Sequence, residues 1–296
     1  MPFGMNKLKN LQILSNFIVG KDTGYNLEDL KSLNFLQELY ISKLQNVTNP
    51  NQIRGQILSN KNNLKVLLLE WEYEENSLKA DVETELLDKL KPPSNLKELT
   101  IRGYGGESFQ SWLGDLSWLS NLVVLKLEEC ERCTSLPSLE MLSSLEDLTI
   151  KEMTSLKRID FQTPFKSLEF LHFEDLKEWE HGDGWRGNEI FPKLRVLSIE
   201  KCPQLTRKVP DRLSSLERFV IKDCPKLVVS FSNYSIHCKL EIDDCEGMVC
   251  NDGSIDFKLL DSRYLANIPA VEDKLKKGSQ KVDLLQIVCN EEIMKS

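Results

Sequence analysis

A single apolar pattern, L-x-x-L-x-(L/I), recurs along the first 250 residues and constrains the fold more than any other feature of the chain. Successive copies lie 21 to 32 residues apart. Self-similarity at such a period indicates a stack of structural repeats, each of which buries its apolar face only against its neighbours. The last apolar residues of the ten copies are Ile13, Ile41, Leu69, Ile101, Leu127, Ile150, Phe173, Ile199, Ile221 and Ile242.

Both the pattern and the period are typical of leucine-rich repeats. The residues between the leucines point away from the core on a short strand. The predicted fold class is therefore α/β: a leucine-rich-repeat solenoid, a curved right-handed superhelix with a parallel β-sheet on its concave face and irregular loops with few helices on its convex face. We expect about ten irregular repeats in residues 1–250, and a non-repeat C-terminal cap or disordered tail in residues 251–296.

Four of the eight cysteines occupy one repeat position, three residues after the last apolar residue of the strand. Cys130 is one of them, so the Cys-x-x-Cys pair that it forms with Cys133 is interpreted as packing. A small residue there turns inward at the end of the strand and can satisfy local backbone groups. Across the ten copies this position holds Asn16, Leu44, Glu72, Tyr104, Cys130, Met153, Leu176, Cys202, Cys224 and Cys245.

Two of the longer gaps between copies show helical spacing of apolar residues and should carry helices on the convex side. Pro92 and Pro93 would end the second helix. The shorter repeats from Leu127 onward have room only for turns or brief 3₁₀ segments. The apolar residues concerned are Ile53, Ile57 and Leu58 in the first gap, and Val82, Leu86, Leu87 and Leu90 in the second.

Charge and hydropathy narrow the function classes. The formal net charge is −8, and we find no basic stripe of the kind that tracks nucleic-acid phosphates, so no nucleic-acid partner is expected. Apolar runs such as 66–69 are too short to span a bilayer, so no membrane span is expected either. The N-terminal residues lack the apolar segment of a signal peptide. The expected location is cytoplasmic or nucleocytoplasmic, with cysteines kept as thiols.

No motif for catalysis or for cofactor binding emerges from the chain, which we predict is not an enzyme. The three histidines have no nucleophile or acid placed beside them by a recognisable motif. The glycine-rich stretch 103–108 lacks the Lys-Ser/Thr ending of a phosphate loop. The Cys-x-x-Cys pair has no second pair to complete a zinc site. We therefore predict no catalytic residue, no metal site and no cofactor in this chain.

Outward-facing strand residues are the candidate partner-binding residues, because they mix charges of both signs on one exposed sheet. Only a minority should matter energetically, since binding energy concentrates in few residues. Trp185, between two glycines in a polar loop, is a further candidate, whereas Trp71, Trp112 and Trp179 are better explained by packing. The strand-derived candidates are Arg102, Tyr104, Lys126, Glu128, Thr149, Lys151, His172, Glu174, Ser198, Glu200, Arg218, Lys222, Glu241 and Asp243.

Several sequence blocks resemble one family closely. They look like successive blocks of the repeat region of plant intracellular disease-resistance proteins, the class with an N-terminal coiled coil and a nucleotide-binding NB-ARC module. The resemblance covers about residues 1 to 250. Its blocks are "MPFGMNKLKNLQILSNFIVGK", "LKVLLLEWEYE", "NLKELTIRGYGGESFQSWLG", "LVVLKLEECERCTSLPSL" and "FPKLRVLSIEKCPQL".

The resemblance implies a non-enzymatic domain that senses pathogen effectors or guarded host proteins, or that holds the NB-ARC module inactive in cis or in trans. In that family ADP or ATP binds the NB-ARC module, and no phosphate loop precedes the repeats here. The chain is accordingly expected to be a fragment or a truncated paralogue that lacks NB-ARC.

Two alternatives belong to other functional classes. The substrate-recognition solenoid of a ubiquitin-ligase adaptor would carry a helix in nearly every repeat. An extracellular leucine-rich-repeat receptor would fit the two formal glycosylation sequons, Asn46-Val-Thr48 and Asn233-Tyr-Ser235, but such tripeptides often arise by chance.

Overall fold

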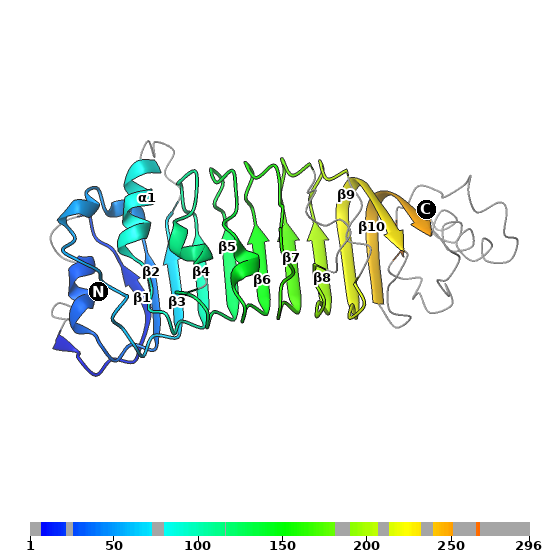
Figure 1. The fold of residues 1–296 in the computed structure, drawn as a ribbon. Helices are drawn as coiled ribbons and strands as arrows, with labels where there is room; N and C mark the ends of the chain where they lie inside the picture. The colour runs from blue at the N-terminus through cyan, green and yellow to red at the C-terminus, as the bar shows by residue number, and fades with distance from the viewer. Residues whose placement is uncertain are drawn as a thin grey trace, which may run out of the picture. The chain divides into compact units, whose positions relative to one another are not determined.

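The fold is seen in a computed structural model, which describes residues 7–21, 26–72, 80–115, 117–180, 190–206, 213–231, 239–250 and 265–266. The chain divides into two compact units, Met1–Leu156 and Lys157–Ser296. Each unit is built from parallel strands that follow one another in chain order, joined by turns, and the first unit also has short helices between its strands (Figure 1). Both units therefore have the leucine-rich-repeat solenoid fold that the apolar pattern predicts.

The first unit contains six parallel strands joined by short turns and helical segments. Each strand pairs with the next, and Leu39, Leu67, Leu99, Leu125 and Leu148 lie side by side across the sheet. The strands are β1 (Ile13–Ile18), β2 (Glu38–Ser42), β3 (Val66–Glu70), β4 (Glu98–Arg102), β5 (Val124–Glu128) and β6 (Asp147–Lys151).

The second unit repeats the arrangement. The neighbours β7 and β8 pair in parallel, as do β8 and β9, β9 and β10, and β10 and β11. Of the predicted cap or tail, 251–296, the structure describes only the two residues of β11, and the rest of that prediction lies outside the described residues. The strands are β7 (Phe170–Glu174), β8 (Val196–Glu200), β9 (Arg218–Phe231), β10 (Lys239–Cys250) and β11 (Leu265–Ala266).

Alternation along the five-residue strands sorts side chains between core and surface. In β5, Leu125 and Leu127 are fully buried, whereas Val124, Lys126 and Glu128 are partly exposed. This period of two is what a strand requires when one face is buried. Each buried leucine meets the equivalent leucine of the next strand, so the core is a continuous column through each unit rather than a closed centre.

A left-handed backbone conformation recurs two residues after the last buried residue of a strand. A positive φ is uncommon outside glycine, yet here it occurs at the same place in seven repeats, including Gly103. Its amide often donates to the next strand; for example, Gly103 N donates to Glu128 O at 2.9 Å, and Glu129 N donates to Lys151 O at 2.9 Å. The other positions are Lys43, Glu152, Asp175, Lys201 and Asp223.

This turn directs the following residue into the core, as the sequence predicts. The thiol of Cys130 is fully buried and points to the backbone oxygens of Glu128 at 3.3 Å and Ile101 at 3.8 Å. Burial raises the pKa of Cys130 to about 12, so its thiol stays protonated near neutral pH. The interpretation of Cys130 as a repeat residue is confirmed. Seven of the ten predicted inward residues are fully buried: Leu44, Tyr104, Cys130, Met153, Leu176, Cys202 and Cys224.

In two of the predicted repeats, the first and the third, the wrong residue was assigned to an inward position. Ile13 was assigned as an inward residue but is 55% exposed, because β1 shifts register before Phe17 and buries Phe17 and Val19 instead. Glu72 was assigned as the inward turn residue of the third repeat but is exposed, and Trp71 is buried in its place. The third repeat lacks the left-handed residue, which explains the one-residue difference.

One of the two predicted helices forms. The helix α1 (Ala80–Lys89) buries Leu86 and Leu87 and ends before Pro92, as predicted. The helix expected around Ile53 and Ile57 was wrong, since that gap holds the 3₁₀ turns η3 (Leu44–Asn46) and η4 (Pro50–Gln52). Gly55 has a φ of +70°, which no helix accommodates, although Ile53, Ile57 and Leu58 are buried all the same. The remaining 3₁₀ segments are η2 (Leu27–Ser32), η5 (Ser111–Gly114) and η6 (Leu139–Met141).

Tyr104 holds the loop after β4 against α1. Its buried hydroxyl lies 2.9 Å from Ser108 O and 3.2 Å from Thr84 Oγ1, and its ring meets Trp71 edge-on at 5.4 Å. Gly105 N donates to the buried carboxylate of Glu83 at 2.6 Å. Burial raises the pKa of Tyr104 to about 12. The only α-helix in the described parts of the chain is therefore fixed to the sheet through a neighbouring loop.

A substitution at Gly103 tests how much the left-handed turn after the strand contributes to stability. A Cβ added to Gly103 would lie 2.0 Å from Trp71 O, a distance that requires backbone movement. We expect Gly103→Ala to lower the free energy of unfolding by about 2 kcal/mol or more, through strain and clash. Glu129→Ala, at the same repeat position but already non-glycine, should lose less than about 1 kcal/mol. Urea unfolding checks this, and equal losses in the two variants would contradict it.

The pH dependence of stability tests the effect of burying the Lys61 ammonium group in the first unit. Its side chain is fully buried, and Nζ donates to the carbonyl oxygens of Leu30 at 2.6 Å and Leu33 at 2.9 Å, at the end of η2. Burial lowers the pKa of Lys61 to about 8, from 10.5 when unfolded. Between these values the unfolded chain binds more protons than the folded chain, so the free energy of unfolding should rise with pH across this window.

The total gain from Lys61 should be at most about 3.5 kcal/mol, because the pKa values differ by about 2.5 units and each unit corresponds to about 1.4 kcal/mol. Urea unfolding at pH 7.5 and pH 10 measures it, with Lys61→Met as the variant that lacks the titrating group. If both proteins change equally between the two pH values, the assignment to Lys61 is wrong.

Candidate recognition surface

Outward side chains of β1–β6 form three cross-strand rows, because parallel pairing aligns equivalent residues of neighbouring strands. We name them the first, middle and last rows, in the order in which the chain reaches them. The first row is Ile13, Glu38, Val66, Glu98, Val124 and Asp147; the middle row is Tyr40, Leu68, Thr100, Lys126 and Thr149; the last row is Glu70, Arg102, Glu128 and Lys151.

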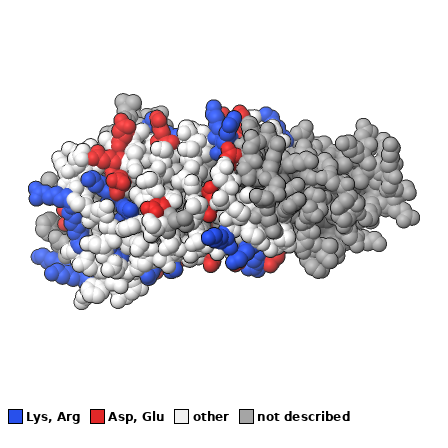
Figure 2. Space-filling model, in the orientation of Figure 1, with Lys and Arg blue, Asp and Glu red and all other residues white. Residues whose placement is uncertain are grey.

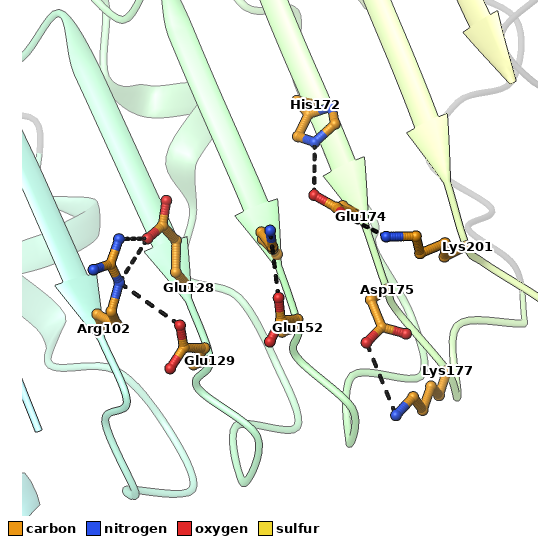
Figure 3. A network of polar contacts seen from close by, with 10 residues as sticks. Arg102, Glu128, Glu129, Glu152, His172, Glu174, Asp175, Lys177 and Lys201 are labelled. Atoms are coloured by element: carbon orange, nitrogen blue, oxygen red, sulfur yellow. Dashed lines mark hydrogen bonds and ion pairs between the residues drawn. The ribbon is translucent and has the colours of Figure 1, made fainter. Parts of the chain in front are cut away.

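The last row is an ion-pair ladder centred on Arg102. Its guanidinium donates to Glu128 Oε2 from Nε at 2.9 Å and lies 3.4 Å from Glu70 Oε1, so it joins three adjacent strands. Glu129, at the left-handed turn, adds a third carboxylate at 3.8 Å. The hydrogen bond to Glu128 raises the pKa of Arg102. Figure 3 shows Glu128 and Glu129 converging on this one cation.

Charge around Arg102 is not balanced. One guanidinium faces three carboxylates, and Lys151, the next cation of the row, contacts Glu152 at 3.4 Å. Burial and then neighbouring acids raise the pKa of Glu129, against the lowering effect of Arg102. This part of the surface therefore carries an excess of negative charge.

Outward residues of the second unit also align in rows. His172 Nε2 lies 3.5 Å from Glu174, which also accepts from Lys201 Nζ at 2.9 Å (Figure 3). Ser198 Oγ donates to Glu200 at 2.7 Å. Across β7 to β9 the rows are Phe170, Val196 and Arg218; His172, Ser198 and Val220; and Glu174, Glu200 and Lys222. In β10 the corresponding strand positions are Lys239, Glu241 and Asp243.

Arg218 and Glu241 form an ion pair with two hydrogen bonds on this surface. Arg218 makes two hydrogen bonds of 3.0 Å to the two carboxylate oxygens of Glu241, a geometry that fixes both side chains. Glu241 is only 6% exposed and Ser198 only 8%. Both predicted candidates therefore lie beneath the surface more than on it, and they position Arg218 and Glu200 instead.

Tyr104 is the predicted contact residue that the structure contradicts. Its ring is fully buried between Trp71 and Phe109, because it occupies the inward position after the left-handed turn at Gly103. It supports the surface from below and offers no area to a partner. The packing interpretation of Trp71, Trp112 and Trp179 is confirmed, since none is more than 3% exposed.

Two further candidates have no described side-chain environment. Trp185 lies outside the described residues, and for Asp243 the structure gives the strand position but no side-chain surroundings. The other strand-derived candidates all face outward: Arg102, Lys126, Glu128, Thr149, Lys151, His172, Glu174, Glu200, Arg218 and Lys222.

Some surface residues were missed by sequence reasoning. Arg195 donates to Glu217 at 2.9 Å and to Glu169 at 3.2 Å, which raises the pKa of Arg195, and it lies one residue before the rows begin. Glu70 was missed because its role depends on the register between β3 and β4. A tabulation of residues at equal repeat positions would have found the Glu-Arg-Glu series in both cases.

Neither of two other site types is present in the described residues. They contain no group of three or more His, Cys, Asp or Glu side chains that could hold a metal ion, and no helix long and apolar enough to cross a membrane. On the face drawn in Figure 2, basic and acidic side chains are interspersed, and acidic ones gather where Figure 1 draws α1.

Comparison of the sequence with known proteins finds a family model and several relatives that match this chain. The family model of R13L1/DRL21 leucine-rich repeats matches residues 27–153. A putative disease resistance protein of Arabidopsis thaliana is 36% identical over 75% of this chain and 17% of its own length. The putative disease resistance RPP13-like protein 1 of the same species is 34% identical over 71% and 22%. Putative disease resistance protein RGA1 of Solanum bulbocastanum is 31% identical over 82% and 25%.

The chain thus spans about a fifth of the length of these relatives. The family-model match covers β2–β6, and the alignment with the third of these relatives extends over most of the chain. Together with the strands and turns described above, these similarities show that the chain is a leucine-rich-repeat region similar to those of plant disease resistance proteins.

Proposed function

We propose that the chain is a non-enzymatic protein-recognition domain that senses a pathogen effector or a guarded host protein, holds an NB-ARC module inactive in cis or in trans, or does both. The observation that carries this proposal is the 31–36% identity to disease resistance proteins over 71–82% of the chain. The outward rows supply a suitable surface, since charges of both signs on a firm backbone set partner choice and encounter rate.

In this proposal the chain itself binds no cofactor, and ADP or ATP binds only the partner module. Its place of action is cytoplasmic or nucleocytoplasmic, where that module would reside. Recognition depends on side chains that are not already used for internal ion pairs. Lys126 and Lys222 are the clearest cases, because each faces outward and neither forms an ion pair with a described residue.

Three observations disfavour the alternatives. An adaptor solenoid would carry a helix in nearly every repeat, but the described repeats contain one α-helix, α1. For an extracellular receptor, Asn46 would be a glycan acceptor, yet its Nδ2 donates to Val19 O at 2.7 Å and holds the loop in place. Among the described cysteines, Cys130, Cys133, Cys202 and Cys224 are free thiols.

Co-precipitation tests the inhibitory part of the proposal. The chain should bind NB-ARC modules expressed in trans from the three relatives described above, and should suppress cell death caused by an autoactive module in leaf tissue. Lys126→Glu with Lys222→Glu should weaken binding about 5- to 20-fold, roughly 1–2 kcal/mol. Lys166→Glu with Lys193→Glu, the same charge change off the rows, is the control.

The sensing part is tested by the same double variant in a leaf response to an effector. Loss of the response with unchanged protein abundance is expected. Failure of the chain to bind any of the three modules would contradict the inhibitory role, and equal effects of the two double variants would contradict the outward rows as the recognition surface.

A further inference from the structure

A cavity of about 570 Å³ lies in the first unit, on the loops that follow β1 and β2. Its volume falls within the range of about 300–1,000 Å³ that is usual for small-molecule sites. Residues 19–21, Asn26 and the loop residues 46–49 and 52–53 line it, and no residue of the outward rows does. We name it the amide cavity, after the side chains described next.

Half of the ten lining residues are polar and uncharged: Asn26, Asn46, Thr48, Asn49 and Gln52. The lining contains one ionisable residue, Lys21, which already has an interaction within the chain. An anionic ligand would therefore find no free cation in this lining. A hydrocarbon ligand is disfavoured as well, because it would cover amide and hydroxyl groups without bonding them. The composition of the lining favours a neutral, polar ligand.

Three of the amides are held in place by hydrogen bonds within the loops. Asn46 Nδ2 donates to Val19 O at 2.7 Å, so Asn46 Oδ1 remains as an acceptor. Asn26 Oδ1 and Asn49 Oδ1 each accept from the backbone amide two residues later, at 3.2 Å and 3.1 Å. Their NH₂ groups remain as donors. The cavity thus offers donors and acceptors on side chains whose positions are fixed.

Two further polar groups of the lining are available to a ligand. The Thr48 hydroxyl and the Gln52 side-chain amide form no hydrogen bond with a described residue, and each can both donate and accept. A sugar hydroxyl is likewise a donor and an acceptor at once, so a ring with several hydroxyls can match a mixed set of this kind. Apolar residues beside the set, Val19 and Ile53, are 4% and 5% exposed.

We propose that the amide cavity binds a neutral saccharide, either a free sugar or the end of a longer glycan, through its four side-chain amides and the Thr48 hydroxyl. The inference goes beyond the proposed function, because it assigns a small-molecule site outside the outward rows. The ligand would join the loop after β1 to the loop after β2. Its binding should therefore stabilise the first unit against unfolding.

Saturation-transfer difference NMR with the full chain tests this inference. The probes are glucose, mannose, xylose, N-acetylglucosamine, cellobiose and chitobiose, and at least one should bind in the millimolar range or more tightly. Glucose 6-phosphate represents an anion, and N-acetyl-Gly-Gly-amide represents a peptide backbone. Both should bind at least about fivefold more weakly than the best neutral sugar, since they match fewer groups of the cavity.

Matched variants locate the site. Thr48→Val with Gln52→Leu removes two groups that form no hydrogen bond with a described residue, so it should leave the fold intact and weaken sugar binding about tenfold. Thr134→Val with Gln56→Leu makes the same chemical changes at exposed residues outside the cavity and should keep the affinity. Circular dichroism confirms that each variant is folded.

Urea unfolding supplies a second readout. The best sugar should raise the urea midpoint of the native sequence and of the control variant more than that of Thr48→Val with Gln52→Leu. General stabilisation by an excluded sugar acts on all three proteins alike, so the comparison removes it.

Three results would overturn the inference: no binding of any neutral sugar, equally tight binding of the phosphate or peptide probe, or equal effects of the two double variants. Cellotetraose and chitotetraose separate the two sources of the ligand. Affinity equal to that of the disaccharides supports a free sugar, whereas tighter binding of the tetramers supports the end of a longer glycan.

Discussion

Seven of the repeats share a left-handed turn directly after the strand, and this turn fixes how one repeat joins the next. At that turn one amide donates to the next strand, and the next side chain enters the core, as at Glu129 and Cys130. A lone repeat of 20 to 30 residues cannot bury its leucines, so this lateral bond and the shared column must form together. The cysteine thiol suits the inward place because it is small and bonds the carbonyl oxygens around it.

The outward rows follow from the parallel register in which neighbouring strands pair. Because equivalent residues stand side by side, any repeated residue choice becomes a line of like or alternating side chains across the sheet. In the last row that line is an ion-pair ladder, in which Arg102 partly neutralises the charges of Glu70 and Glu128. In the first row, by contrast, Glu38 and Glu98 form no ion pair with a described residue.

Unlike repeats show where local chemistry overrides the pattern. In the longer fourth repeat, Tyr104, Gly105 and Glu83 hold a loop against α1. The ring of Tyr104 is buried in this arrangement and is not exposed on the surface. In the gap around Ile53, apolar spacing predicted a helix, but Gly55 and Pro50 favour turns that still bury the same side chains. Burial was therefore predictable there, whereas backbone conformation was not.

From the sequence alone one could derive the repeat, the parallel strands, the inward cysteines, α1 and most of the outward-facing residues, since each depends on spacing within a single copy. Only the tertiary structure decided the register of β1 against β2, the exposure of Ile13, the burial of Tyr104 and the pairing of Arg102 with Glu70 and Glu128. The physical reason is that these properties depend on contacts between copies, and a periodic pattern specifies which face a residue is on but not which neighbour it meets.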